Sequence, residues 1–359
     1  MKETSSRNIG SHGQDLNDGS SLGPINDRIN AEAVSIVPYS YRTLDRQWLL
    51  ADSRVIDRPS PELWQVRGTR QIFLNELQSQ QVGVGPAISI APFIPNMDHF
   101  KGNSGGRILP IYRDGKNTKW NLLPGFLDLM NQQIAGHVTE SMLFSYLAGI
   151  TAFPAFSESF ADDLRQGGVR LPITLQFDLF TEVADLGSTA IELFTYCEKT
   201  LNRETVQVTV RIKNGPHIMG EKAAFRGMPE SAIYDSESET LHLGELSIGG
   251  VAEDVWSYQV SGMPVVKKWI GYRKFSPSTK WSSSLNEIIT ESWPKAWTEE
   301  LLDLLHVITQ LRNLESKHES LLEKVLAGPL LSNAAVNKAG LLPAPAYMTK
   351  PASESDGLL

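Results

Sequence analysis

The sequence lacks features on which several classes of protein depend. Its 359 residues include one cysteine, Cys197, so neither an internal disulfide framework nor a cysteine zinc cage can form. A lone cysteine fits a reducing compartment, and we expect its side chain to be a small, buried or half-buried group rather than a catalytic thiol. No stretch approaches the roughly 18 consecutive apolar residues of a membrane helix, and residues 1–21 lack the apolar core of a signal peptide. These absences predict a cytoplasmic protein without a membrane partner.

The common catalytic motifs are missing as well. A phosphate-binding loop ends in Gly-Lys-Ser/Thr, but residues 220–222 read Gly-Glu-Lys, and the glutamate would repel phosphate. An amino-group methyltransferase grips its flipped base with an acidic residue or Asn, two prolines and an aromatic, whereas Pro38-Tyr39 follows Val37. The seven histidines show no ligand spacing on one helical face. We therefore expect no catalytic residue, no metal and no cofactor.

The composition is that of a folded protein with polar ends. The apolar fraction of 41% and the charged fraction of 21% are close to globular averages. Residues 1–33 are polar and predict a flexible leader, and residues 331–359, which contain three prolines and a polar end, predict a flexible tail. The folded part is expected at 34–330, with a division into two subdomains near 125–200 left open.

Hydrophobic periodicity changes along this folded part. Residues 34–124 mix short apolar runs with Gly, Pro and Asn, which predicts a β-rich section. Apolar residues at helical spacing predict a helix behind Thr139 and another over about 178–198, where Gly187 interrupts the stripe. Valines and an isoleucine alternate with polar residues over 206–212, which predicts a half-buried strand.

The last third predicts more strands and then one long helix. Strands are expected at 240–248, 255–260 and 264–270. An acidic start at Glu299, an apolar seam and a Gly328-Pro329 stop predict an amphipathic helix from Thr298 onward. The predicted fold class is α+β: a mixed β-sheet with several packed helices and a long C-terminal amphipathic helix.

The charge distribution favours a local basic surface. The chain carries a net charge of −8, so it cannot coat nucleic acid through a generally basic surface. Between Gly262 and Asn286, however, five basic and no acidic residues alternate with aromatics, as in surfaces that contact phosphates. A solvated strand with core aromatics explains this segment equally well.

A second basic segment, Pro38 to Trp120, holds eleven Lys/Arg against seven Asp/Glu. Arginine dominates it, and arginine can donate two hydrogen bonds to guanine in the major groove. We interpret the group of Tyr41, Arg42, Asp45 and Arg46 as an internal unit of ion pairs and packing contacts, slightly in preference to a direct DNA contact. We expect the two basic segments to lie near each other and to form one basic face.

Several motifs resemble a known family. The segment 38–48, Pro-Tyr-Ser-Tyr-Arg-Thr-Leu-Asp-Arg-Gln-Trp, is similar to the Tyr-Arg-Pro-Phe-Asp-x-Arg-Trp opening of target-recognition domains in Type ISP restriction-modification enzymes. Residues 108–113 and 121–124 resemble its Leu-Pro-Leu-Tyr and Asn-Leu-x-Pro segments, residues 153–173 its Ser-Pro-Ala-Tyr and Pro-Arg-Ile-Pro block, and residues 258–274 its Tyr-x-Val-Ser-Gly and Trp-x-x-Tyr-Arg region. The resemblance spans about 36–328, with Thr43-Leu44 in place of the usual Pro-Phe and Cys197 where glycine is common.

This resemblance implies a sequence-specific DNA recognition module of a restriction-modification system. Its implied partners are double-stranded DNA, an adenine methyltransferase and a translocase or nuclease component, encoded separately or lost. The alternatives are a truncated remnant without function and a self-contained nuclease with an unrecognised site. The candidate DNA-binding residues from both basic segments are Arg42, Arg46, Arg70, Arg107, Lys267, Lys268, Tyr272, Arg273 and Lys274.

Overall fold

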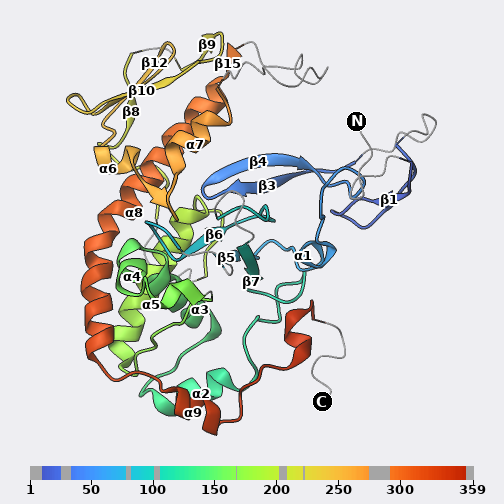
Figure 1. The fold of residues 1–359 in the computed structure, drawn as a ribbon, viewed down its shortest axis with the longest axis vertical. Coiled ribbons are helices and arrows are strands. Elements are labelled where there is room, and N and C mark those ends of the chain that lie inside the picture. Colours follow the sequence, from blue (N-terminus) through green and yellow to red (C-terminus); the bar gives the residue numbers. More distant parts are fainter. Residues whose placement is uncertain are drawn as a thin grey trace.

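A computed structural model describes residues 10–25, 34–77, 82–100, 106–166, 168–201, 208–220, 223–274 and 292–352. It has helices and several small sheets, which confirms the α+β class (Figure 1). The helices of the described residues are α1 Pro61–Gln65, α2 Phe126–Gln133, α3 Glu140–Thr151, α4 Pro154–Ser159, α5 Phe177–Phe194, α6 Glu253–Trp256, α7 Val265–Gly271, α8 Lys295–Ala327 and α9 Asn333–Lys338.

Antiparallel pairing forms every sheet of the described residues, and the sheets are small. The first group of strands is β1 Gly13–Gln14 with β2 Ser21–Leu22, β3 Ile36–Arg42 with β4 Asp45–Leu50, and β5 Phe73–Leu77 between β6 Ile88–Ala91 and β7 Gly106–Pro110. The second group is β8 His217–Ile218, β10 Ala232–Asp235, β11 Thr240–Leu243 and β12 Leu246–Gly249 in one sheet, β9 Phe225–Arg226 with β15 Ser292–Trp293, and β13 Gln259–Val260 with β14 Met263–Pro264. The predicted β-rich section over 34–124 is confirmed.

The long helix α8 runs along one side of the molecule and packs on α4, α5 and α6 (Figure 1). The sheet of β8, β10, β11 and β12 lies at one end of α8, and the hairpin β3–β4 projects across the middle. One large apolar core extends from Leu44 to Val325, and a smaller cluster around Trp64 and Phe73 lies beneath the hairpin. The hairpin is thus held between two cores.

Three predicted helices are confirmed. The side chain of Thr139 accepts a hydrogen bond from the Met142 backbone N–H and caps α3, as its position predicts. Helix α5 ends at Phe194, before the predicted residue 198, because Tyr196 and Cys197 adopt left-handed backbone angles. Helix α8 begins before Thr298, whose hydroxyl instead donates to the Ala223 carbonyl and accepts from the Trp293 indole.

Two of the predicted strands are wholly or partly wrong. Residues 265–270 fall on α7, where Val265, Val266, Trp269 and Ile270 bury one helical side, and Pro264 ends β14. The β-branched valines misled the prediction because tertiary packing overrode their strand propensity. Residues 255–260 divide between α6 and the short strand β13, whereas β11 and β12 confirm the prediction for 240–248.

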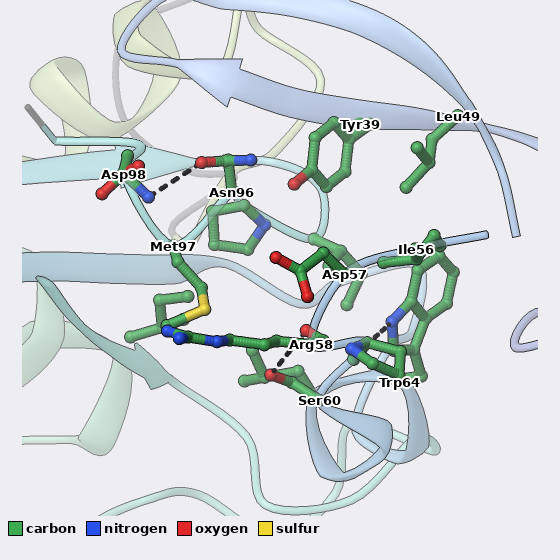
Figure 2. Close-up of a pocket in the computed structure, with 15 residues that line it drawn as sticks. Tyr39, Leu49, Ile56, Asp57, Arg58, Ser60, Trp64, Asn96, Met97 and Asp98 are labelled. Carbon is green, nitrogen blue, oxygen red and sulfur yellow. Dashed lines mark hydrogen bonds between the residues drawn. The ribbon is translucent and has the colours of Figure 1, made fainter. Parts of the chain in front are cut away.

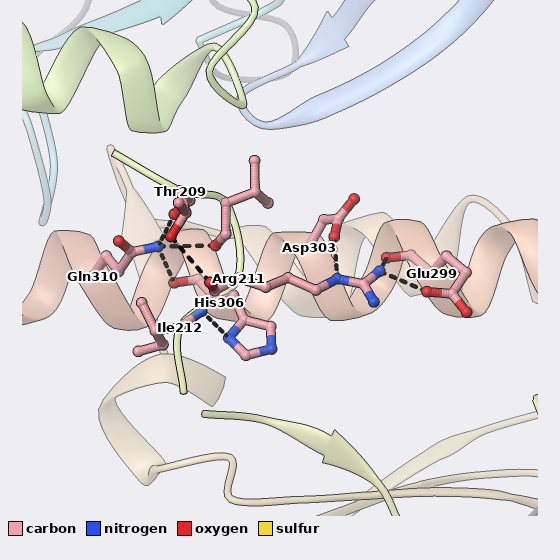
Figure 3. Close-up of polar contacts among 8 residues, drawn as sticks. Thr209, Arg211, Ile212, Glu299, Asp303, His306 and Gln310 are labelled. Atoms are coloured by element: carbon pink, nitrogen blue, oxygen red, sulfur yellow. Dashed lines mark hydrogen bonds and ion pairs between the residues drawn. The ribbon is translucent and has the colours of Figure 1, made fainter. Parts of the chain in front are cut away.

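The predicted strand over 206–212 is wrong for residues 208–212, and 206–207 lie outside the described residues. Half-buried and exposed positions do alternate here, but the segment lies on α8 rather than in a sheet (Figure 3). The Arg211 guanidinium pairs with Glu299 and Asp303 at 2.6 Å each, and the Gln310 amide donates to the Thr209 and Val210 carbonyls. The alternation of apolar and polar residues, which predicted a strand in a sheet, therefore arises because one side of the segment packs on the surface of a helix.

Parts of the predicted leader and tail lie within the described residues, and their flexibility stays a prediction. Residues 10–25 contain the β1–β2 hairpin, and Leu22 is only 2% exposed. In the tail, α9 is followed by a 3-10 turn at Ala346–Thr349, and the Arg113 guanidinium donates to the Tyr347 and Lys350 carbonyls. The division into two subdomains stays a prediction.

Helices α3 and α5 meet at a pair of glycines, Gly149 and Gly187. A Cβ at Gly187 would overlap the Ser145 carbonyl oxygen and the Gly149 nitrogen, so the two helix backbones approach closely there. The glycine that interrupts the apolar stripe of α5 is therefore the contact point of the helix pair.

We predict that Gly187→Ala destabilises the protein, because the added methyl group forces the helices apart, at a cost of about 1 to 3 kcal/mol. Urea unfolding measures this cost. Gly271→Ala is the matched control, since nothing lies within 4 Å of the Cβ position at Gly271. Equal unfolding midpoints for both variants would show that the α3–α5 contact is looser than described.

Candidate nucleic-acid interface

The β3–β4 turn and the end of α7 form the meeting point of the two basic segments. Leu44 occupies the turn with φ 61° and is buried, and the Tyr196 hydroxyl donates to its carbonyl at 2.7 Å. The Tyr41 and Tyr272 rings pack edge to face with centroids 5.0 Å apart. The predicted proximity is thus confirmed for residues 262–274, while 275–291, including Lys280, lie outside the described residues.

Arg273 and Asp45 form a buried ion pair at this meeting point. The Arg273 guanidinium donates to Asp45 Oδ1 at 2.8 Å, and its carbon lies 3.7 Å from the centroid of the Trp269 ring. Arg273 is 8% exposed, and burial raises the pKa of the Asp45 carboxyl while Arg273 opposes that shift. The guanidinium is committed to a partner inside the protein, so the geometry favours a structural role for Arg273 over the predicted DNA contact.

Arg42 and Arg46 flank the same turn and are half-buried. The Arg42 guanidinium packs on Tyr41 at 4.1 Å and donates to Asn96 Oδ1 at 3.1 Å. The Arg46 guanidinium lies over the Tyr196 ring at 3.9 Å and pairs with Glu198 at 2.8 Å. The interpretation as an internal packing unit is confirmed, but its acidic partners differ, because Asp45 pairs with Arg273 and Arg46 pairs with Glu198.

The side chains of Lys267, Lys268, Tyr272 and Lys274 are exposed beside this cluster. The Lys267 ammonium lies 5.1 Å from the Trp256 ring centroid, and the Lys274 ammonium donates to the Glu230 carbonyl at 3.3 Å. An exposed ammonium on a flexible stem is suited to a phosphate contact. We refer to Lys267, Lys268 and Lys274 as the α7 lysines.

Arg70 and Arg107 lie elsewhere in the fold. Arg70 donates to the Asn117 carbonyl and lines a pocket of about 550 Å³ together with Trp120 and Lys199, and burial lowers the pKa of Lys199. Arg107 pairs with the buried carboxylate of Glu76. Both guanidinium groups are engaged within the protein, and DNA binding by either residue stays a prediction.

A further pocket of about 510 Å³ lies beneath the β3–β4 hairpin (Figure 2). We refer to it as the hairpin pocket. Its walls come from the hairpin, the loop before α1, the loop after β6 and strand β7, and the extended side chain of Arg58 lies along it. Arg58 is not among the candidates predicted from the sequence, although the arginine-rich stretch and the Pro59-Ser60-Pro61 loop that follows offered a signal.

The described residues offer no metal site and no activated thiol. Among them, no three His, Cys, Asp or Glu side chains are grouped closely enough to hold a metal ion, and no helix is long and apolar enough to cross a membrane. Cys197 is exposed rather than buried, because it follows the end of α5 in a left-handed conformation. Desolvation and the Glu192 carboxylate raise the pKa of its thiol, the opposite of what a nucleophile needs.

The fold is similar to those of three solved proteins in complex with DNA or a DNA mimic. The chain is similar to a nuclease-deletion mutant of the Type ISP enzyme LlaGI in complex with a DNA substrate mimic (TM-score 0.54, 17% identity, 85% of this chain and 26% of that one). It is similar also to the ATP-dependent Type ISP enzyme LlaBIII bound to DNA (0.57, 14%, 84% and 19%) and to the protein of a DrdV–DNA complex (0.56, 15%, 83% and 28%). A comparison with curated proteins gives no match.

Residues 6–304 match the Type ISP C-terminal specificity domain, and the chain belongs to that family. The match begins well before the predicted start of the folded part at residue 34, in agreement with the β1–β2 hairpin. The chain spans only 19–28% of the length of the three similar proteins.

We predict that Arg273→Gln lowers the free energy of unfolding by about 3 to 5 kcal/mol, because it leaves the Asp45 carboxylate buried without its partner. Lys274→Gln is the matched control, since Lys274 is exposed, and its loss should change stability by less than about 0.5 kcal/mol. Denaturant unfolding of both variants measures the difference. A stable Arg273→Gln protein with reduced DNA affinity would reverse the structural assignment of Arg273.

Proposed function

We propose that this chain is a DNA target-recognition domain that binds duplex DNA sequence-specifically and positions the other parts of a restriction-modification system. The observation that carries the proposal is the family match over residues 6–304. The three similar structures are DNA complexes of restriction enzymes or a DrdV protein, which supports the same ligand for this chain. Catalysis belongs to the other parts in this proposal.

The α7 lysines supply the phosphate contacts in this proposal. They are exposed, in contrast to the paired arginines of the hairpin turn, and Tyr272 lies beside them as an exposed aromatic. Because the chain as a whole carries a net charge of −8, a local basic surface would orient the DNA and keep other faces away from it.

The hairpin also offers an apolar surface for a protein partner. Trp48 is 73% exposed, and Ile36 pairs with Leu50 next to it on the same exposed side of β3–β4. A contiguous exposed apolar patch is typical of interaction sites. Because the chain spans only 19–28% of the length of the three similar proteins, we propose that this patch contacts another part of such a system, the methyltransferase among the implied partners.

Affinity for duplex DNA is predicted to fall steeply with salt. With about five to eight phosphate contacts, a plot of log affinity against log salt should have a slope of roughly −5 to −7. Lys267→Gln together with Lys268→Gln should flatten that slope by about one unit for each phosphate that is no longer bound, and should leave sequence preference unchanged. Fluorescence anisotropy across a salt series measures both. If neither random nor host DNA binds at low salt, the chain is a remnant without DNA-binding function.

The purified chain alone is expected neither to methylate DNA nor to hydrolyse ATP, because it lacks the phosphate loop and the base-gripping tetrapeptide. Purified through a tag from its native host, it is expected to bring down a protein with methyltransferase motifs, and methyl transfer should appear in that complex. Trp48→Asp should lose this protein, whereas Lys268→Gln should retain it. Methyl transfer by the pure chain would contradict the proposal.

A further inference from the structure

Arg58 differs from the other arginines of the N-terminal half. The eight arginines between residues 34 and 124 all belong to the described part, and seven of them hold a hydrogen bond or an ion pair there. The Arg58 side chain has neither among the described residues, and it is exposed. An unpaired, exposed guanidinium keeps all five donors available for a ligand.

The backbone around Arg58 is fixed on both sides. Before it, the buried Asp52–Arg54 ion pair at 2.7 Å and the bond from the Ile56 N–H to the Asp52 carbonyl hold the chain. After it, the Trp64 indole donates to the Pro59 carbonyl at 2.8 Å. Arg58 itself has a φ of 53°, in the left-handed region that a non-glycine residue adopts at a cost. The loop therefore presents the side chain from a defined position.

The charges of the hairpin pocket argue against a phosphate ligand. Arg58 shares the pocket with two carboxylates, Asp57 and Asp98, so the lining has more acidic than basic side chains and is unlike a phosphate-binding surface. The remaining polar groups include the amide of Asn96, whose oxygen accepts from the Asp98 N–H at 2.8 Å (Figure 2). Guanidinium, carboxylate and amide groups are the side-chain types that discriminate base edges.

We propose that the rim of the hairpin pocket is a base-reading site and that Arg58 specifies a guanine there by donating to its O6 and N7 atoms. This inference rests on the proposed function and adds to it the site of sequence reading. Because the guanidinium is exposed on a fixed loop, it reaches the edge of the guanine while that base remains stacked in the duplex. The two carboxylates disfavour any position of the protein along the DNA in which a phosphate occupies this site.

The test is selection of bound duplexes from a randomised library by the full chain and by Arg58→Gln. The wild type is expected to enrich a sequence with a guanine at one position, and Arg58→Gln should lose that guanine preference by roughly five- to hundredfold while other positions keep theirs. The slope of affinity against salt should stay unchanged. Arg226→Gln is the matched control, since Arg226 is exposed and forms no hydrogen bond or ion pair through its side chain within the described ranges.

The possible outcomes distinguish a failure of the base-reading inference from a failure of the proposed function. A wild-type preference that Arg58→Gln retains in full would overturn this inference and leave the proposed function standing. A uniform loss of affinity over all sequences, with a salt slope flatter by about one unit, would make Arg58 a phosphate contact and overturn the inference as well. A wild type without any sequence preference would overturn the proposed function and, with it, this inference. Unfolding midpoints equal to that of the wild type ensure that both variants are folded.

Discussion

The buried ion pair between Asp45 and Arg273 joins the β3–β4 hairpin to the end of α7, and the rest of the candidate interface depends on it. Thr43, in the same turn, bonds to the Ser89 hydroxyl at 2.9 Å and to the His99 carbonyl. Burying two charges contributes little net stability, but a partner left alone is costly, so the pair fixes one position of the hairpin against α7. Together with the packing of the hairpin on the two cores, this contact positions what the hairpin carries, including its wall of the hairpin pocket.

The same constraint divides the basic residues by role. Three arginines act as structural cations, because their guanidinium groups contact aromatic rings, carbonyl groups and carboxylates around the turn: Arg42, Arg46 and Arg273. The α7 lysines and Arg58 keep exposed charges, and Arg58 lines the same pocket as the carboxylates of Asp57 and Asp98. In our account the lysines hold the backbone of the DNA and Arg58 reads a base, a division between positioning and specifying contacts that is general in protein–DNA complexes.

The sequence allowed prediction where structure follows local periodicity. The helices α3, α5 and α8 were predicted from apolar spacing, a cap at Thr139 and a stop at Gly328. The strand predicted at 264–270 was wrong because valine-rich residues pack as a helix, and residues 208–212 alternate because α8 lies beneath them (Figure 3). The roles of the arginines could not be predicted, since the acid that neutralises Arg273 lies 228 residues away. Arg58 was missed for the same reason: only the fold shows which arginine side chain has no hydrogen bond or ion pair within the described part of the chain.

In the proposed complex, DNA lies against both the α7 lysines and the rim of the hairpin pocket. A structure of the chain bound to a duplex selected for tight binding tests it most directly. The account predicts phosphates within hydrogen-bond distance of Lys267 and Lys268 and a guanine edge at the Arg58 guanidinium. A duplex bound along the Glu299–Asp303 side of α8, with Arg58 and the α7 lysines in solvent, would contradict it.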